Sequence, residues 1–232
     1  VGADPDTTAS VLEADGQPIL INYAAHAVFY GPENMHPSGD WPGAISAKYH
    51  CPVLMGAIGD VSPHSDEATP EGRIADFVQR FDRAFRRTPT PQVVWRNGDP
   101  LVFSRSPIHL DPVKPHPTMA AAYHAPQAMA EFVVKSFAPK SAEVTAFRLG
   151  TLSLCGIPGE PTSHLGRAIQ AGSKNPVLVI SHVNGWMGYI LGPEDYDKGG
   201  YEATLSFYGR EEGEKVVAIQ TRASVCVGVN TQ

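Results

Sequence analysis

Short apolar runs bounded by turn residues recur along this chain of 232 residues. Strands buried on both faces have continuous apolar runs, whereas half-exposed strands alternate apolar and polar positions. The run QPILINYA at 17–24 follows a turn at Asp15 and Gly16 and is typical of a buried strand. The same pattern predicts strands over 17–24, 52–57, 93–96, 101–110, 143–149, 151–157, 176–183 and 223–229, with a hairpin around Gly150.

Helical periodicity is strongest over 70–87, where apolar residues return every three or four positions. Further helices are predicted over 42–49, over 161–171 and over 118–137 with a break or kink at Pro126, and a short element is predicted within 209–222. The irregular alternation of strands and helices predicts an α/β fold with mixed β-sheets layered with helices. Because the chain has 22 glycines and 21 prolines, the fold is expected to be loop-rich.

Composition narrows the class of protein. Hydrophobic residues make up 42% and charged residues 18%, so the chain is expected to bury a core. The net charge of −6 lacks the basic excess of a general nucleic-acid binder, so no nucleic acid partner is expected. No apolar run reaches the roughly 18 residues of a membrane span, so no transmembrane segment is predicted. The first residues match no signal peptide and no initiator methionine, which indicates the interior of a longer gene product or a processed chain.

Polar residues follow the ends of several predicted strands. They are His26 after 17–24, Asp60 and Ser62 after 52–57, Glu160 after 151–157, and Asn184 and Tyr189 after 176–183. Proteins of the α/β class place binding and catalytic groups in such loops. Each residue alone also has a structural explanation, because Asp and Ser bond to turn backbones and a lone His or Tyr commonly packs. The recurrence of the pattern is what makes these residues a candidate site.

Five segments carry a resemblance to a known family. They are INYAAHAV (21–28), SGDWPG (38–43), GAIGDVSPH (56–64), IPGEPTSHLGRAI (157–169) and NGWMGYILGPEDYDKGGYEATLSFYG (184–209). In the same order, they resemble segments of the neutral/alkaline (non-lysosomal) ceramidase family. Each motif alone is weak, but the agreement of several independent motifs is specific, and together they extend over most of the chain.

The resemblance implies a zinc-dependent hydrolase of N-acyl amide bonds, with an N-acylated small molecule or lipid as substrate. That family holds Zn²⁺ with two histidines, a glutamate and a tyrosine. By motif, three of these ligands match His26, Glu160 and Tyr189. Ser62 matches the serine of the family's GDVSPN motif, as a nucleophile or a hydrogen-bond donor, and Asp60 is expected to orient its neighbours. Tyr189 is also expected to stabilise the oxyanion of amide cleavage.

The sequence departs from the family at two points. The family's first zinc histidine lies in an upstream THTH-like segment, and residues 1–25 contain no histidine. His64 stands where the GDVSPN motif has Asn. The resemblance therefore implies that residues 1–232 form one segment, the second part of a larger catalytic domain. A second chain of the same precursor would carry the missing histidine, or the chain is a fragment. A secreted or periplasmic location is implied by the family alone.

Two other functions stay open at this stage. The missing histidine favours a non-catalytic subunit or binding module derived from such an enzyme. Ser62 favours a serine esterase or amidase, although Gly59–Pro63 is not the G-x-S-x-G elbow of serine hydrolases. His182 could support a ligand and Trp186 could line an acyl pocket, but each also suits a structural role.

Overall fold

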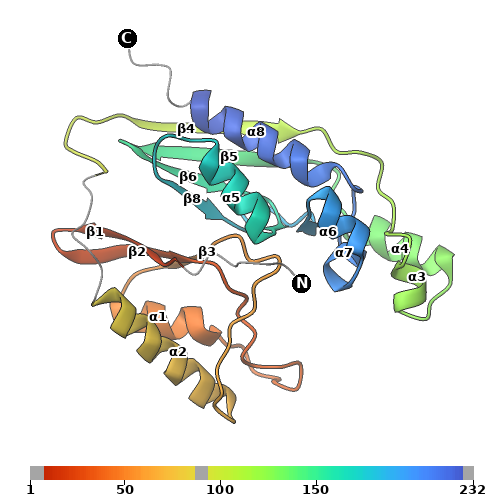
Figure 1. Ribbon diagram of the computed structural model, residues 1–232, viewed down its shortest axis with the longest axis horizontal. Helices are drawn as coiled ribbons and strands as arrows, with labels where there is room; N and C mark the ends of the chain where they lie inside the picture. The colour runs from red at the N-terminus through yellow and green to blue at the C-terminus, as the bar shows by residue number, and fades with distance from the viewer. Residues whose placement is uncertain (1–7, 87–93, 227–232) are drawn as a thin grey trace.

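The structure is a computed structural model that describes residues 8–86 and 94–226 (Figure 1). Its strands are β1 (Ser10–Ala14), β2 (Gln17–Tyr23), β3 (Val53–Met55), β4 (Leu101–Ile108), β5 (Ala142–Leu149), β6 (Leu152–Gly156), β7 (Glu160–Pro161), β8 (Val177–Ile180) and β9 (Tyr189–Ile190). Its helices are α1 (Asp40–Tyr49), α2 (Pro70–Phe85), α3 (Met119–Ala122), α4 (Gln127–Phe137), α5 (Ser163–Ala171), α6 (Pro193–Lys198), α7 (Tyr201–Thr204) and α8 (Glu212–Cys226). The predicted α/β fold with mixed sheets is confirmed.

The N-terminal sheet has the strand order β1-β2-β3 and is covered by α1 and α2. β1 and β2 form an antiparallel hairpin, and the turn residues Asp15 and Gly16 have positive φ values of 51° and 72°. Glycine adopts such angles freely, and Asp tolerates them better than most residues. β2 pairs in parallel with β3. Ile21, Trp41 and Phe77 belong to the core between this sheet and its helices.

A second sheet has the order β4-β5-β6-β8. Its first three strands are antiparallel, and β8 runs parallel to β6. α5 and α8 pack on one face of this sheet and lie in front of it in Figure 1. The main core fills the space between them and includes Ala146, Cys155, Val179 and Val216.

The two sheets adjoin along β3 and β8. The Asn22 Nδ2 donates to the Val179 carbonyl at 3.0 Å, and the Ser181 N–H donates to the Met55 carbonyl at 2.9 Å. Because Met55 ends β3 and Ser181 follows β8, the two strands run in the same direction. The carboxyl ends of β2, β3, β6 and β8 therefore lie at one end of the molecule. That end is where the loops with the candidate residues emerge.

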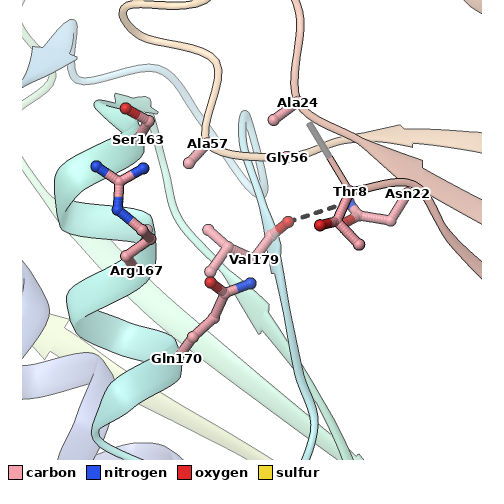
Figure 2. A pocket seen from close by; sticks show the side chains of 10 residues that line it. Thr8, Asn22, Ala24, Gly56, Ala57, Ser163, Arg167, Gln170 and Val179 are labelled. Carbon is pink, nitrogen blue, oxygen red and sulfur yellow. Dashed lines mark hydrogen bonds between the residues drawn. The ribbon is translucent and has the colours of Figure 1, made fainter. Parts of the chain in front are cut away.

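A small pocket lies between the N-terminal sheet and α5 (Figure 2). Asn22 and Gly56 line one side, Arg167 and Gln170 of α5 line the other, and Val179 of β8 lies between them. Ile21 points the opposite way, into the core under α1 and α2. The helices of the two sheets thus pack on opposite faces. The pocket volume of about 20 Å³ suits about one water molecule and is far too small for an acyl chain.

Several predicted elements are confirmed. The helix over 70–87 is present as α2, and Thr69 caps it by accepting a hydrogen bond from the Gly72 N–H at 3.1 Å. The hairpin turns at Gly150, between β5 and β6. The helix over 118–137 is split into α3 and α4, because Pro126 precedes α4 and has an extended backbone with ψ of 146°. Among the described residues, no helix has the length and apolarity needed to cross a bilayer.

Two predicted strands are wrong. Residues 223–226 of the predicted strand 223–229 form the end of α8, and 227–229 lie outside the described residues. The buried residues Val216, Gln220 and Ala223 recur at helical spacing, which explains the helix. Residues 94–96 of the predicted strand 93–96 form no strand, and Val93 lies outside the described residues. The Val94 carbonyl accepts from the Thr151 N–H at 2.8 Å, but a turn at Asn97 and Gly98 follows at once.

Candidate active site

His26 follows β2, and its backbone is held on both sides. Its N–H donates to the Val61 carbonyl at 2.9 Å, and its carbonyl accepts from the Trp41 indole N–H at 2.9 Å. The first bond brings the loop of Asp60 and Ser62 next to His26, and the second ties His26 to the first turn of α1. The imidazole is thereby placed by two elements distant in sequence.

Glu160 and Tyr189 are direct partners in the parallel pair of β7 and β9. Glu160 begins β7, one short loop beyond β6, and Tyr189 begins β9, after the loop that follows β8. Gly59 packs closely against this pair, because a Cβ at Gly59 would lie 2.6 Å from the Glu160 carbonyl oxygen. The Gly59 N–H also donates to the Pro161 carbonyl at 2.9 Å. This close approach explains a glycine at the start of the GDVSP segment.

The buried carboxylate of Glu160 is the centre of the site. The Trp186 indole N–H donates to its Oε1 at 2.6 Å, and the His182 Nε2 lies 3.2 Å from the same oxygen. The other oxygen, Oε2, lies 3.7 Å from the His26 Nε2. Burial by itself raises the pKa of Glu160, but the hydrogen bonds from His182 and Trp186, together with the electrostatic effect of His182 and His26, leave the pKa below its ordinary value. Glu160 is therefore ionised at neutral pH.

Protonation of the neighbouring groups is also set by the surroundings. Burial lowers the pKa of His26 below its ordinary value, and this exceeds the opposing effect of Glu160. Burial and then the negative charge of Glu160 raise the pKa of Tyr189. At neutral pH the site thus holds a neutral imidazole, a carboxylate and a protonated phenol. The rings of His26 and Tyr189 lie 6.1 Å apart, and the Tyr201 ring lies 5.9 Å from that of Tyr189.

Asp60 and Ser62 differ in their surroundings. The Asp60 carboxylate accepts from the Ser163 N–H at 2.6 Å and from the Ser163 hydroxyl at 2.9 Å. Asp60 therefore ties its loop to the first residue of α5, which suits an orienting role. Ser62 is exposed, two residues further along the same loop.

No known protein-family profile matches the chain. A stretch of 86 residues is 31% identical to the neutral ceramidase of Mycobacterium tuberculosis (strain ATCC 25618 / H37Rv), covering 34% of this chain and 14% of that protein. The crystal structure of neutral ceramidase from Pseudomonas aeruginosa matches with a TM-score of 0.66 and 17% identity, over 91% of this chain and 44% of that chain. A ceramidase complexed with C2 matches with a TM-score of 0.67 and 16% identity, over 90% of this chain and 45% of that chain.

The chain is thus similar to neutral ceramidases in fold over about nine tenths of its length, and in sequence over a stretch of 86 residues. The family resemblance predicted from the five sequence segments is confirmed. The chain spans less than half the length of the solved ceramidase structures that it matches. The roles of the individual site residues stay predictions, which rest on the geometry described above.

The ceramidase-like segments bring three predicted residues together. His26, Glu160 and Tyr189 share one site, although they come from three separate parts of the chain. His182 and Trp186 hold the Glu160 carboxylate. From the sequence, His182 was considered as a support for a ligand, whereas Trp186 was considered only for an acyl pocket or the core. Both belong to the loop after β8, in which His182 and Asn184 have positive φ values of 60° and 62°. This loop geometry has no clear sequence signal, because neither residue is glycine.

Within residues 8–86 and 94–226, no group of three or more His, Cys, Asp or Glu side chains is placed so that it could hold a metal ion. His26 and Glu160 are two such side chains, and Tyr189 is the strand partner of Glu160.

Proposed function

We propose that this chain is part of a zinc-dependent hydrolase of the ceramidase type that cleaves an N-acyl amide bond. The observation that carries the proposal is the convergence of His26, Glu160 and Tyr189 at the carboxyl ends of the strands. A second segment, on another chain of the same precursor or elsewhere in the same protein, would supply the remaining zinc histidine.

The protonation states of these residues fit Zn²⁺. The metal binds neutral imidazole and carboxylate oxygen, and the lowered pKa values of His26 and Glu160 favour those two forms. Two donors and a phenol do not complete a site by themselves, which is why the proposal requires a further ligand from outside the described residues. When bound, Zn²⁺ would lower the pKa of its water toward about 7 and polarise the scissile carbonyl.

The residues of this chain would then bind and orient the reacting groups. Tyr189 keeps its proton at neutral pH and can donate a hydrogen bond to the oxygen on which negative charge develops. Asp60 fixes the loop that carries Ser62 by its two hydrogen bonds to Ser163. Ser62 can attack the carbonyl carbon or donate a hydrogen bond to the oxyanion, and both roles need its exposed position.

The proposal is tested on the intact protein with a fluorogenic N-acyl amide and with metal analysis. His26→Ala is expected to abolish hydrolysis and to reduce the bound zinc. His50→Asn is the matched control. His50 is exposed at the C-terminal end of α1, whereas Trp41, which contacts His26, lies in the first turn of that helix. Asn tolerates the left-handed backbone of His50, which has a φ of 54°.

The outcomes separate the three candidate functions. Hydrolysis that a chelator abolishes and zinc restores supports the proposal. If His26→Ala leaves every activity of the assembled protein unchanged, the chain is a non-catalytic subunit. If hydrolysis survives the chelator and a fluorophosphonate probe labels Ser62, the protein is a serine hydrolase.

A further inference from the structure

The second sheet has two apolar faces. Side chains that are direct partners in neighbouring strands point to the same face. Phe103, Phe147 and Leu154 are such partners across β4, β5 and β6, and Leu101 and Leu149 form the next row. Leu154 pairs with Leu178 of β8. Ile180 lies two residues after Leu178 and therefore points to the same face. These six residues, Leu101, Phe103, Phe147, Leu149, Leu154 and Ile180, are called the bare sheet face below.

The bare sheet face is the face away from α5 and α8. The alternate residues Val102, Ala146, Cys155 and Val179 belong to the core under those helices. None of the six bare-face residues belongs to any core of the described residues. Leu101 is 60% exposed and Phe103 is 54% exposed, whereas the other four residues are half-buried. Leu152 and Leu178 share this face by register and are buried, so the exposed apolar part lies at β4. Because a solvent-facing sheet surface normally carries polar residues, an apolar one indicates an interaction surface.

One end of the bare sheet face leads to the candidate active site. Glu143 lies on the same side of β5 and forms an ion pair with Arg105 at 3.6 Å. Its Oε1 also accepts a hydrogen bond from the Asn184 side chain at 3.4 Å. Asn184 lies between His182 and Trp186, which hold the Glu160 carboxylate. A polypeptide on this face would therefore lie alongside the site.

We propose that the bare sheet face is covered by the part of the ceramidase fold that this chain does not span. The match takes in 91% of this chain but only 44% of the Pseudomonas aeruginosa structure, so more than half of that fold has no counterpart here. A remainder that packs on this segment would find exposed apolar side chains at Leu101 and Phe103, on the face that leads to the site. The further claim that the same polypeptide delivers the missing zinc ligand rests on the proposed function.

The first experiment maps the neighbour of Phe103 in the intact protein isolated from its source. A photoreactive benzophenone amino acid replaces Phe103, and cross-linked peptides are sequenced by mass spectrometry. The expected product links position 103 to a peptide from outside residues 1–232. The matched control carries the same group at Phe132, which is 67% exposed on α4. It is expected not to link to that peptide.

Two results would overturn the proposed occupant. A link between two copies of residues 1–232 would identify the face as a self-association surface. A link to lipid alone, or to nothing, would identify it as a lipid-facing or a free surface. Because both positions are exposed, neither replacement is expected to disturb the fold of this segment.

A second variant keeps the proposal testable if cross-linking is inefficient. Phe103→Asp is expected to weaken assembly with the remainder at least tenfold, measured by native mass spectrometry, or to lower the melting temperature if both parts share one polypeptide. Phe132→Asp is expected to change neither, and equal behaviour of the two variants would refute the interface. Zinc content is measured in parallel. An assembled protein without zinc refutes the metal site but keeps the interface. A protein that binds zinc while Phe103 stays uncovered refutes the interface but keeps the metal site.

Discussion

Two glutamates of this chain are almost equally buried and behave in opposite ways. Glu160 is 7% exposed and Glu212, the first residue of α8, is 3% exposed. Hydrogen bonds from His182 and Trp186 hold the pKa of Glu160 below its ordinary value. Burial raises the pKa of Glu212 to about 7, only partly opposed by Lys215. Neither oxygen of Glu212 accepts a hydrogen bond among the described residues, and the Lys215 Nζ is 3.8 Å from Oε2.

The difference teaches that burial alone does not mark a site. A buried carboxylate stays ionised only where donors point at it, and building such donors takes residues from several elements. Glu160 has them and lies among other polar groups, whereas Glu212 lacks them. The two residues should therefore respond oppositely to pH and to neutral substitution.

The largest effect is expected for Glu160→Gln, which removes the charge that the site is built to hold. Amide hydrolysis should fall by about a hundredfold or more, because a carboxamide is a poor metal ligand, and the bound zinc should fall with it. Glu131→Gln serves as the control, since Glu131 of α4 pairs with Lys135 and does not touch Glu160 or its partners. Full activity of Glu160→Gln would remove the distinction between the two glutamates.

The next effect is expected for Glu212→Gln, measured as the free energy of unfolding against pH. Glu212 has a folded pKa of about 7 against a reference of 4.5, so stability is highest below pH 4.5 and falls as the pH rises to about 7. At about 1.4 kcal/mol per pKa unit, the loss is about 3 kcal/mol. The variant should lose this pH dependence and be more stable above pH 7. Glu214→Gln, at an exposed position of α8, should keep it.

A smaller effect is expected for Trp186→Phe, which removes one donor from Glu160 and retains a ring that can pack on Phe207. Loss of such an orienting hydrogen bond weakens metal binding by about 10- to 100-fold. Zinc affinity by chelator competition is the measurement. Trp95→Phe, which removes an exposed indole bond to the Asp99 carbonyl, should leave that affinity unchanged.

The smallest effect is expected for Asp111→Asn. The Asp111 carboxylate raises the pKa of Glu212 and pairs with Lys215. Its neutralisation should lower the pKa of Glu212 and shift the pH dependence of stability to lower pH, by about one unit or less. A shift to higher pH would mean that the ion pair with Lys215, rather than repulsion by Asp111, governs Glu212.

The sequence predicted the local elements well where one simple pattern decided them. The hairpin at Gly150 and the break at Pro126 follow from the conformations of single residues. α8 was predicted only as a short element of unstated type within 209–222, because Gln220, a polar residue, occupies a fully buried helical position and interrupts the apolar period. Its amide donates to the Thr145 carbonyl at 3.0 Å, a bond that only the assembled fold provides.

The candidate site could be predicted only in part. Residues after strand ends were correctly expected to gather, because parallel strands deliver their carboxyl ends to one edge. A supporting role for His182 was considered, but its contact and that of Trp186 with Glu160 could not be predicted, because they depend on a loop whose left-handed residues are His182 and Asn184. Nor could the bare sheet face, since strand alternation does not say which face a helix will cover.

The pairing of β7 with β9 has a consequence for engineering. The backbone pairing of β7 with β9 sets the separation between Glu160 and Tyr189. The 28 residues that lie between them in the sequence do not determine this separation. The loop from Gly172 to Pro176, between α5 and β8, lies mostly at the surface. Insertions there, or new chain ends, should leave the carboxylate and the phenol in place, so this connection is the natural point at which to split or permute the protein.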